Sequence, residues 1–329
     1  MAGAAASAAM SARNGNSRGV VLLSVLLVLA LLSAIAWQLM GRHSLVIAQS
    51  RFTFTGDQAM EYALGAEAFA RQVLYEEWSR GGPKDTLQEV WAQPTAPFEV
   101  DNGFLEVQVR DMHRCFNLNS LAGQSWQQNL QRLKTLLRNR SVPDPLADAW
   151  RDWVDSDLLI EGFGAEDGEY LLEDTPYRTA NAPAADLSEL RLVRGLEREY
   201  LEALGDALCV LPSTELRINV NTASPAVLAA MSPNLSEPAL QAFTEAVRDY
   251  DNLSAVTAEF PDLTAAVDVL TVSSEYFRVN VRAQVDDSQV ELSSLLRRDP
   301  SSGQIQLISR DFGRNFQSLF TADTEGGEE

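Results

Sequence analysis

An uninterrupted apolar run near the N-terminus constrains this chain more than any other feature. From Val20 to Met40 there is no charged residue, no proline and no glycine, and the only polar residues are Ser24, Ser33 and Gln38. At about 1.5 Å per residue, a helix of this length spans roughly 31 Å, the thickness of the hydrocarbon core of a bilayer. The run therefore predicts a segment that enters a membrane.

Three interpretations of this run are open from the residues alone. It is a retained N-terminal anchor, a secretory signal peptide cleaved after residues 34–36, or a segment cut after Gly19, which leaves Val20 as the new N-terminus. The run is longer than the usual signal-peptide core of ~7–15 residues, which counts against the second interpretation. Arg13 and Arg18 precede the run, so the positive-inside rule keeps the leader cytoplasmic and places the rest of the chain across the membrane.

The net charge of the chain limits the classes of partner that it can bind. The sequence has 26 basic and 46 acidic residues; without the two arginines of residues 1–19, 24 basic residues remain, and the net charge is −22. Such a surface repels nucleic acid and anionic lipid and attracts metal cations or basic partners, although simple solubility explains it equally well. The two cysteines, Cys115 and Cys209, are either a disulfide or two buried thiols, and an exported chain favours the disulfide.

Periodicity predicts the fold class. Apolar residues at three- and four-residue spacing continue the helix from residue 59 to about Arg80, with Glu67 among the polar residues outside that stripe, and Gly41 and residues 53–56 are weak points. Residues 104–110, 276–283, 289–296 and 304–308 indicate strands, and the stretch from 125 to 266 reads as helical patches. A helical domain inserted into a small α+β domain is the economical interpretation.

The predicted organisation follows from these patterns. We expect a leader at 1–19, a transmembrane helix at 20–42 and a stem helix with the first strands of the head at 43–120. An inserted α-helical domain at 121–271, the remaining strands at 272–315 and a disordered acidic tail at 316–329 complete the chain.

An acidic cluster is the strongest site candidate. Its carboxylates are Asp152, Asp155, Asp157, Glu161, Glu166, Asp167 and Glu169. Carboxylates this dense repel one another, and a hard cation with oxygen ligands would relieve that repulsion. Asp155, Asp157 and Glu166 fit positions 1, 3 and 12 of a calcium-loop register, but Leu159 and Ile160 break it. The residues leave two possibilities, a calcium site outside the EF-hand geometry or a solvated acidic loop.

The sequence gives little support for nucleic-acid binding, zinc binding or catalysis. Residues 216–228 resemble the opening of a helix-hairpin-helix module, but neither a glycine-rich hairpin nor a basic residue follows, which argues against DNA binding. The two histidines, His43 and His113, do not form a zinc pair, and the sequence has neither a phosphate-binding loop nor a nucleophile elbow. We therefore expect no enzyme.

Several stretches together resemble one family, the type II secretion minor pseudopilin K (GspK). The prepilin leader junction, the FNLN segment, the acidic loop and the later landmarks of that family are similar, in the same order, to residues 18–27, 115–121, 152–157 with 164–167, 188–195, 218–223 and 276–279. The resemblance implies that a prepilin peptidase cleaves between Gly19 and Val20 and methylates Val20. Most pilin-like subunits carry a glutamate at the fifth mature position, and the K family resembles this chain in lacking it, since Ser24 stands there.

The missing glutamate has a physical consequence. In lipid a glutamate is costly unless it meets a partner, which in pilins is the N-terminal amine of the preceding subunit. A subunit with Ser24 needs no neighbour above it, and a bulky inserted domain would block further stacking. The resemblance thus implies the tip of the periplasmic pseudopilus of a type II secretion system, with initiation or capping of its assembly and without catalysis.

The resemblance also implies a fold, a ligand set and partners. The fold is a pilin-like antiparallel sheet head on a long N-terminal transmembrane and stem helix, interrupted by a large inserted all-helical domain. Calcium in the insertion is expected on Asp155, Asp157, Glu166 and Asp167, with Glu161 and Glu169 as further ligands, while the apolar insert at 158–160 could reshape that site.

Expected partners are minor pseudopilins I and J, also H and the major pseudopilin G, the prepilin peptidase and the bacterial inner membrane, with the C-terminal domain periplasmic. The alternative is a signal-peptide-cleaved soluble periplasmic protein that binds calcium or is a hydrolase.

Overall fold

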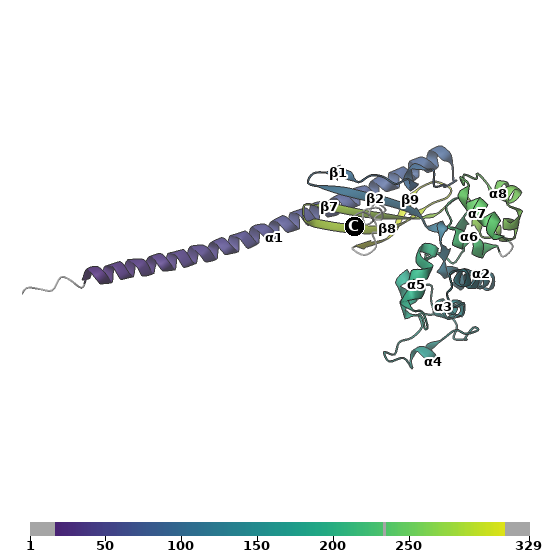
Figure 1. Cartoon of the computed structure of the whole chain (residues 1–329), viewed down its shortest axis with the longest axis horizontal. Coiled ribbons are helices and arrows are strands. Elements are labelled where there is room, and N and C mark those ends of the chain that lie inside the picture. Colours follow the sequence, from purple (N-terminus) through teal and green to yellow (C-terminus); the bar gives the residue numbers. More distant parts are fainter. Residues whose placement is uncertain (1–16, 233–234, 313–329) are drawn as a thin grey trace, which may run out of the picture. The chain divides into compact units, whose positions relative to one another are not determined.

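A computed structural model describes residues 17–232 and 235–312 and divides the chain into two compact units, Met1–Gln58 and Ala59–Glu329 (Figure 1). Helix α1 (Ser17–Gly81) is unbroken, so the predicted weak points do not interrupt it. Within residues 53–56 the hydroxyls of Thr53 and Thr55 donate to carbonyls one turn earlier, at 3.0 Å each, which keeps these β-branched residues inside the helix. Most of the predicted leader and the whole predicted acidic tail lie outside the described residues.

A five-stranded antiparallel sheet forms the head, in the order β1-β2-β7-β8-β9. Its strands are β1 (Phe98–Val100), β2 (Gly103–Asp111), β7 (Tyr276–Val285), β8 (Ser288–Arg298) and β9 (Ile305–Phe312). The central pair joins segments far apart in sequence, since Val107 pairs with Val281 and Val109 with Val279. The chain therefore leaves the sheet at the end of β2 and returns to it at β7.

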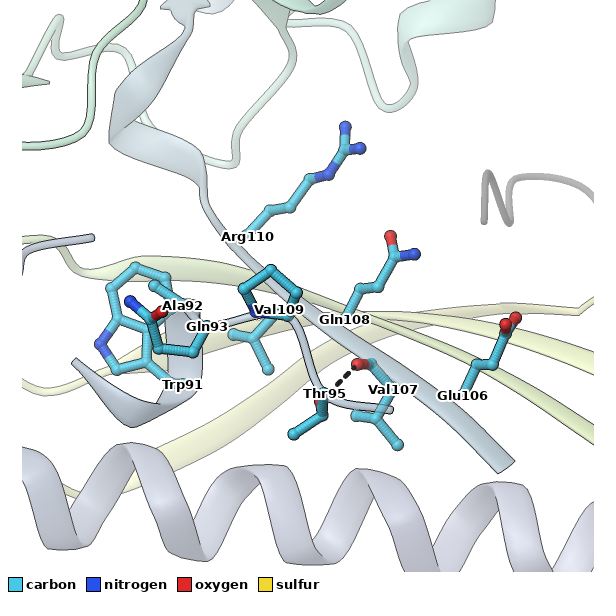
Figure 2. A pocket seen from close by; sticks show the side chains of 10 residues that line it. Trp91, Ala92, Gln93, Thr95, Glu106, Val107, Gln108, Val109 and Arg110 are labelled. Atoms are coloured by element: carbon cyan, nitrogen blue, oxygen red, sulfur yellow. Dashed lines mark hydrogen bonds between the residues drawn. The ribbon is translucent and has the colours of Figure 1, made fainter. Parts of the chain in front are cut away.

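One face of this sheet covers the second half of α1. Figure 2 shows Val107 and Val109 of β2 on the side of the helix and Glu106, Gln108 and Arg110 on the opposite side, as the two-residue period of a strand requires. On the helix, buried alanines at 59, 63, 66 and 70 and the buried Leu74 meet the apolar side chains of β7 and β8. Small helix residues allow the helix to approach the sheet closely.

Glu67 breaks the expectation for this helix. Sequence periodicity assigns it to the polar side, but its side chain is only 1% exposed. Its carboxylate accepts hydrogen bonds from Ser294 Oγ at 2.6 Å and from Arg310 Nε and Nη2 at 2.7 and 2.9 Å. These donors lie on β8 and β9, more than two hundred residues away, so the local pattern could not have indicated them. The carboxylate ties α1 to the far strands of the sheet.

The segment between β2 and β7 is mainly helical. Its α-helices are α2 (Trp126–Asn139), α3 (Leu146–Val154), α4 (Asp167–Tyr170), α5 (Arg198–Leu204), α6 (Pro225–Met231), α7 (Glu237–Glu245) and α8 (Leu253–Glu259). Besides the predicted helices, this segment contains two short pairs of parallel strands. They are β3 (Phe116–Asn117) with β4 (Leu208–Cys209), and β5 (Ile218–Asn219) with β6 (Leu270–Thr271). The predicted fold class is confirmed, and its exact domain boundaries remain predictions.

Buried asparagines hold the insertion together. Asn119 donates to the carbonyls of Ala184 and Leu211 at 2.8 and 2.9 Å and accepts from the Ala184 N–H at 2.8 Å. Asn221 exchanges two hydrogen bonds with the backbone of Tyr250, at 3.1 and 3.0 Å. Both asparagines are almost fully buried. An amide side chain offers both a donor and an acceptor, so each of these residues can bind the backbone N–H and C=O groups of a distant segment, as a neighbouring strand would.

A buried polar joint connects the insertion to the head. Asp111, at the end of β2, accepts hydrogen bonds from Thr222 Oγ1 at 2.5 Å, Ser274 Oγ at 2.7 Å and Asn219 Nδ2 at 3.1 Å. Asn219 and Thr222 belong to the insertion, whereas Ser274 precedes β7. A buried network of several hydrogen bonds favours one arrangement of its members, so this joint helps to set the orientation of the insertion on the head.

Asp85 completes the joint from the loop after α1. It forms a buried ion pair with Arg298 of β8 and accepts the backbone N–H of Ser274 at 2.7 Å, while its carbonyl accepts Asn219 Nδ2 at 3.1 Å. The side chains of Asp85 and Arg298 are 1% and 2% exposed. Five segments of the chain thus meet at one polar cluster.

The two cysteines lie near the same junction between the insertion and the head. Cys115 and Cys209 form a disulfide with a sequence separation of 94 residues, next to the β3–β4 pairing. Met112, Leu211, Tyr276 and Leu295 pack around it. The bond closes the largest part of the insertion on itself at the point where it leaves the head.

We predict that the disulfide carries much of the stability of the insertion. Replacing both cysteines by serine should lower the free energy of unfolding by about 2–5 kcal/mol, because a loop of this length loses its constraint in the unfolded chain. Denaturant unfolding measures this loss, and thiol counting on the unreduced denatured wild type should find no free thiol. An unchanged unfolding midpoint, or two free thiols in the wild type, would contradict the prediction.

The second prediction concerns pH. Burial raises the pKa of Asp85 to about 7, although Arg298 beside it acts in the opposite direction. Between pH about 4 and 7 the folded state keeps a proton that the unfolded chain has released, so the contribution of Asp85 to stability falls as the pH rises through that window.

An Asp85→Asn variant stays neutral throughout. The stability advantage of the wild type over it should therefore be larger at pH 5 than at pH 8 when both are unfolded in urea. Asp174→Asn, which changes an exposed carboxylate, is the control. Equal differences between the wild type and Asp85→Asn at the two pH values would refute this account of Asp85.

Candidate functional site

Two regions correspond to the sequence-predicted sites: the N-terminal junction and the acidic loop. At the junction, α1 includes Gly19 and Val20, and Val20 is exposed. The hydroxyl of Ser24 donates to the carbonyl of Val21 at 2.8 Å, inside its own helix. Ser24 thus satisfies its polar group without any neighbour, which a glutamate at this position could not do. Within the described residues, one helix, Val20–Gly81, is long and apolar enough to cross a membrane.

The acidic loop between α3 and α4 is held by carboxylates of α3. Asp152 accepts a hydrogen bond from the backbone N–H of Glu161 at 3.1 Å. Asp148 accepts one from the backbone N–H of Phe163 at 3.3 Å and forms an ion pair with Lys134 at 2.6 Å. Both aspartates are almost fully buried. Because they are four residues apart on one helix face, the two side chains reach the same stretch of loop.

Two glycines permit this close approach. Gly162 has a positive φ of 56°, and a Cβ there would lie 2.6 Å from an oxygen of Asp148. A Cβ on Gly164 would lie 2.0 Å from an oxygen of Asp152. Any other residue at either position would push the loop away from α3. The spacing of these glycines was the sequence signal for a tightly folded loop, and it was missed.

Asp155 and Glu166 are the carboxylates with unused oxygens. Each is 5% exposed. Glu166 Oε1 and Asp155 Oδ1 lack a hydrogen bond, whereas Asp155 Oδ2 forms an ion pair with Arg151, whose Nη2 lies 3.1 Å away. Burial raises the pKa of Asp155, with the negative charges of Asp157 and Glu161 acting in the same direction and Arg151 against it.

The same causes act on the neighbouring carboxylates. Burial raises the pKa of Glu166, a hydrogen bond from Thr179 opposes the shift, and the charges of Asp155 and Asp157 add to it. For Asp152 burial is again the largest cause and its pKa rises to about 7. A cluster whose members resist ionisation in one another's presence is electrostatically frustrated, and a bound cation would stabilise its ionised form.

The other predicted ligands have partners within the protein or face solvent. Asp167 accepts from Thr179 N and Oγ1 at 3.1 and 3.0 Å and pairs with Arg178 at 2.8 Å. Glu169 accepts the Glu166 N–H at 3.0 Å as part of the N-terminal cap of α4. Asp157 is exposed and accepts the Leu159 N–H at 2.9 Å, and Glu161 is half-buried.

The described residues contain no group of three or more His, Cys, Asp or Glu side chains already arranged to hold a metal ion. The loop therefore gathers the predicted carboxylates in one neighbourhood, with some of them unsatisfied, but does not present a closed cage. Asp155 and Glu166 fit a cation best, because each keeps one buried oxygen, Asp155 Oδ1 and Glu166 Oε1, without a hydrogen-bond donor.

The apolar insert of the loop is exposed to solvent. Leu158, Leu159 and Ile160 are 67%, 71% and 50% exposed, and Phe163 is 82% exposed. These side chains lie at the surface of the loop, and the expectation that they reshape the candidate site stays a prediction. Asp157 and Asp152 fix the backbone from which these side chains project.

Within the part of the chain that the structure describes, two cavities lie in the head and at its junction with the insertion. One beside β2, lined among others by Trp91, Thr95 and Val107, has a volume of about 40 Å³, which suits a few water molecules (Figure 2). A larger one, of about 340 Å³, lies between β7, β8 and residues 211–217. Its charges pair with one another, since Arg217 contacts Glu215 at 3.1 Å and Glu275 at 3.3 Å. His113 lines it but is buried, and burial lowers its pKa.

Comparison with known proteins gives consistent matches. The family model described as "Type II secretion system (T2SS), protein K" matches residues 218–273, and its first-domain model matches residues 114–213. The type II secretion system protein K of Pseudomonas aeruginosa is 36% identical over 313 residues, covering 90% of this chain and 93% of the relative. That of Aeromonas hydrophila is 33% identical over 318 residues, covering 88% and 95%.

A solved structure also resembles this chain. It is a crystal structure of the GspK–GspI–GspJ complex from the type 2 secretion system of enterotoxigenic Escherichia coli. The two chains superpose with a TM-score of 0.72 at 26% sequence identity, over 81% of this chain and all of the other.

Proposed function

Since the chain belongs to the type II secretion system protein K family and is a minor pseudopilin of such a system, we propose that it forms the tip of the periplasmic pseudopilus and initiates or caps its assembly. The observation that carries this proposal is the insertion of a large helical region between two central strands of a pilin-like head. A helical mass rigidly fixed at the end of the sheet leaves no room for another subunit above it.

Ser24 supports the same position in the filament. Its hydroxyl is satisfied by the carbonyl of Val21 at 2.8 Å, so this helix brings no buried charge that must find a partner in the membrane. A subunit with these properties can lead the filament, whereas those that follow would supply the charged contacts. The alternative of a cleaved, soluble periplasmic protein is not favoured, because the relatives align over nearly the whole chain.

We propose minor pseudopilins I and J as direct partners, because the similar solved chain belongs to a GspK–GspI–GspJ complex. The apolar helix fits a membrane-anchored protein. We further propose a single pass through the bacterial inner membrane with the head in the periplasm, contact with pseudopilins H and G in the filament, and processing by a prepilin peptidase. A structural role without catalysis agrees with the names of the relatives and with the paired charges of the larger cavity.

The third prediction tests the partners. The portion from residue 43 onward, mixed with the soluble portions of minor pseudopilins I and J, should elute as one ternary complex in size-exclusion chromatography. The double cysteine-to-serine variant is a useful comparison, because it perturbs the insertion but leaves the sheet and stem contacts of Glu67 in place. Separate elution of all three wild-type proteins would remove the tip assignment.

We also propose that the acidic loop binds calcium. Asp155 and Glu166 would hold the ion through Asp155 Oδ1 and Glu166 Oε1, the buried oxygens that no donor engages, with Asp157 and Glu161 as further carboxylates that can turn toward it. Asp167 and Glu169 are weaker ligands in this proposal, because Arg178, Thr179 and the cap of α4 already engage them. When bound, the ion neutralises carboxylates that otherwise repel one another.

The fourth prediction follows from this assignment. Removing metal with EDTA should lower the melting temperature, because an ion that binds only the folded state stabilises it by about 2.7 kcal/mol at a hundredfold excess over its dissociation constant. Asp155→Asn and Glu166→Gln should each reduce the calcium-dependent shift, whereas Asp174→Asn, an exposed carboxylate of the same stretch, should keep it. Identical melting curves with and without calcium, after confirmed metal removal, would contradict calcium binding.

A further inference from the structure

The exposed apolar side chains of the acidic loop call for a partner. Leu158, Leu159, Ile160 and Phe163, here named the loop patch, are each at least half exposed within six consecutive positions. A run of consecutive apolar residues in water is unfavourable and marks an interaction surface more often than a structural feature.

The loop patch is held in place by its own backbone contacts. Asp157 accepts the Leu159 N–H at 2.9 Å, Asp152 accepts the Glu161 N–H at 3.1 Å and Asp148 accepts the Phe163 N–H at 3.3 Å. The Gly164 N–H donates to the Glu161 carbonyl at 2.8 Å. Three carboxylates therefore anchor the backbone while the apolar side chains project outward, so little ordering entropy is lost when a partner binds.

Charge selects the class of partner. Between Arg151 and Arg178 the chain contains nine carboxylates and no lysine or arginine, and three of the nine pair with arginines that flank or follow this stretch. A single calcium ion would neutralise only two of these charges. An anionic membrane surface or a second copy of the same loop would be repelled, and a basic protein surface would be attracted.

We propose that the loop patch docks into an apolar depression rimmed by lysine or arginine on a protein other than minor pseudopilins I and J. This inference rests on the proposed position at the tip, where the insertion is free to meet other components of the secretion machinery or its cargo. The apolar side chains provide contact area, and the surrounding carboxylates provide orientation and selectivity.

Site-specific crosslinking in secreting cells tests the proposal with the full-length chain. With p-benzoylphenylalanine in place of Phe163, light should give a crosslink to a protein other than I and J, at a peptide that combines apolar residues with lysine or arginine. Adding Leu158→Ser, Leu159→Ser and Ile160→Ser should reduce that crosslink at least tenfold. The same photoreactive residue at Val247, an apolar side chain of the insertion that is 75% exposed, should not give it.

Function and assembly are measured in parallel. The triple serine variant, or Leu159→Ser alone if the triple variant melts at a lower temperature than the wild type, should reduce secretion of the system's exoproteins at least tenfold. Val247→Ser should secrete normally. Both patch variants should still co-purify with I and J and keep their calcium-dependent melting shift, which separates failure of this inference from failure of the proposed function.

Several results would overturn the inference. Crosslinks only to I, J, a second copy or lipid would assign the loop patch to another partner. Absence of any crosslink from Phe163, or secretion within twofold of the wild type in the variants, would show that it has no partner needed for secretion.

Discussion

The hydrogen bonds that converge on Asp111 are the constraint on which the arrangement of this protein depends. Asp111 ends β2, where the chain leaves the sheet, and its carboxylate binds Asn219 and Thr222 of the insertion and Ser274 just before β7. In the proposed function a fixed insertion would be needed for the head to block further stacking, because a loosely tethered domain could move aside for another subunit. The proposed function therefore depends on the hydrogen bonds of this carboxylate, because they hold the insertion on the head.

The sequence predicts those parts whose interactions are local. The apolar run indicates α1, two-residue alternation indicates β2, β7 and β8, and the density of carboxylates indicates the acidic loop. Glu67 could not be placed, because Ser294 and Arg310, which make its burial favourable, lie more than two hundred residues away. The joint is hidden for the same reason, since its members become neighbours only after the chain has left the sheet and returned.

Within the acidic loop, the carboxylates divide into two groups that composition alone cannot separate. Asp148 and Asp152 hold backbone N–H groups, and Asp167 and Glu169 are engaged around α4, so these four act in folding. Asp155 and Glu166 keep buried oxygens without donors. The loop thus uses part of its negative charge to build itself, and the remainder is available to a cation.

The mass of the mature N-terminus tests the central claim, that this chain is processed and anchored as a pseudopilin, most directly. Mass spectrometry of the protein purified from its own membranes should find a chain that begins at methylated Val20, with the apolar helix retained. A chain that begins at Trp37, after cleavage within the apolar run, would contradict the account, because the protein would then lack the anchor that places a pseudopilin in the filament.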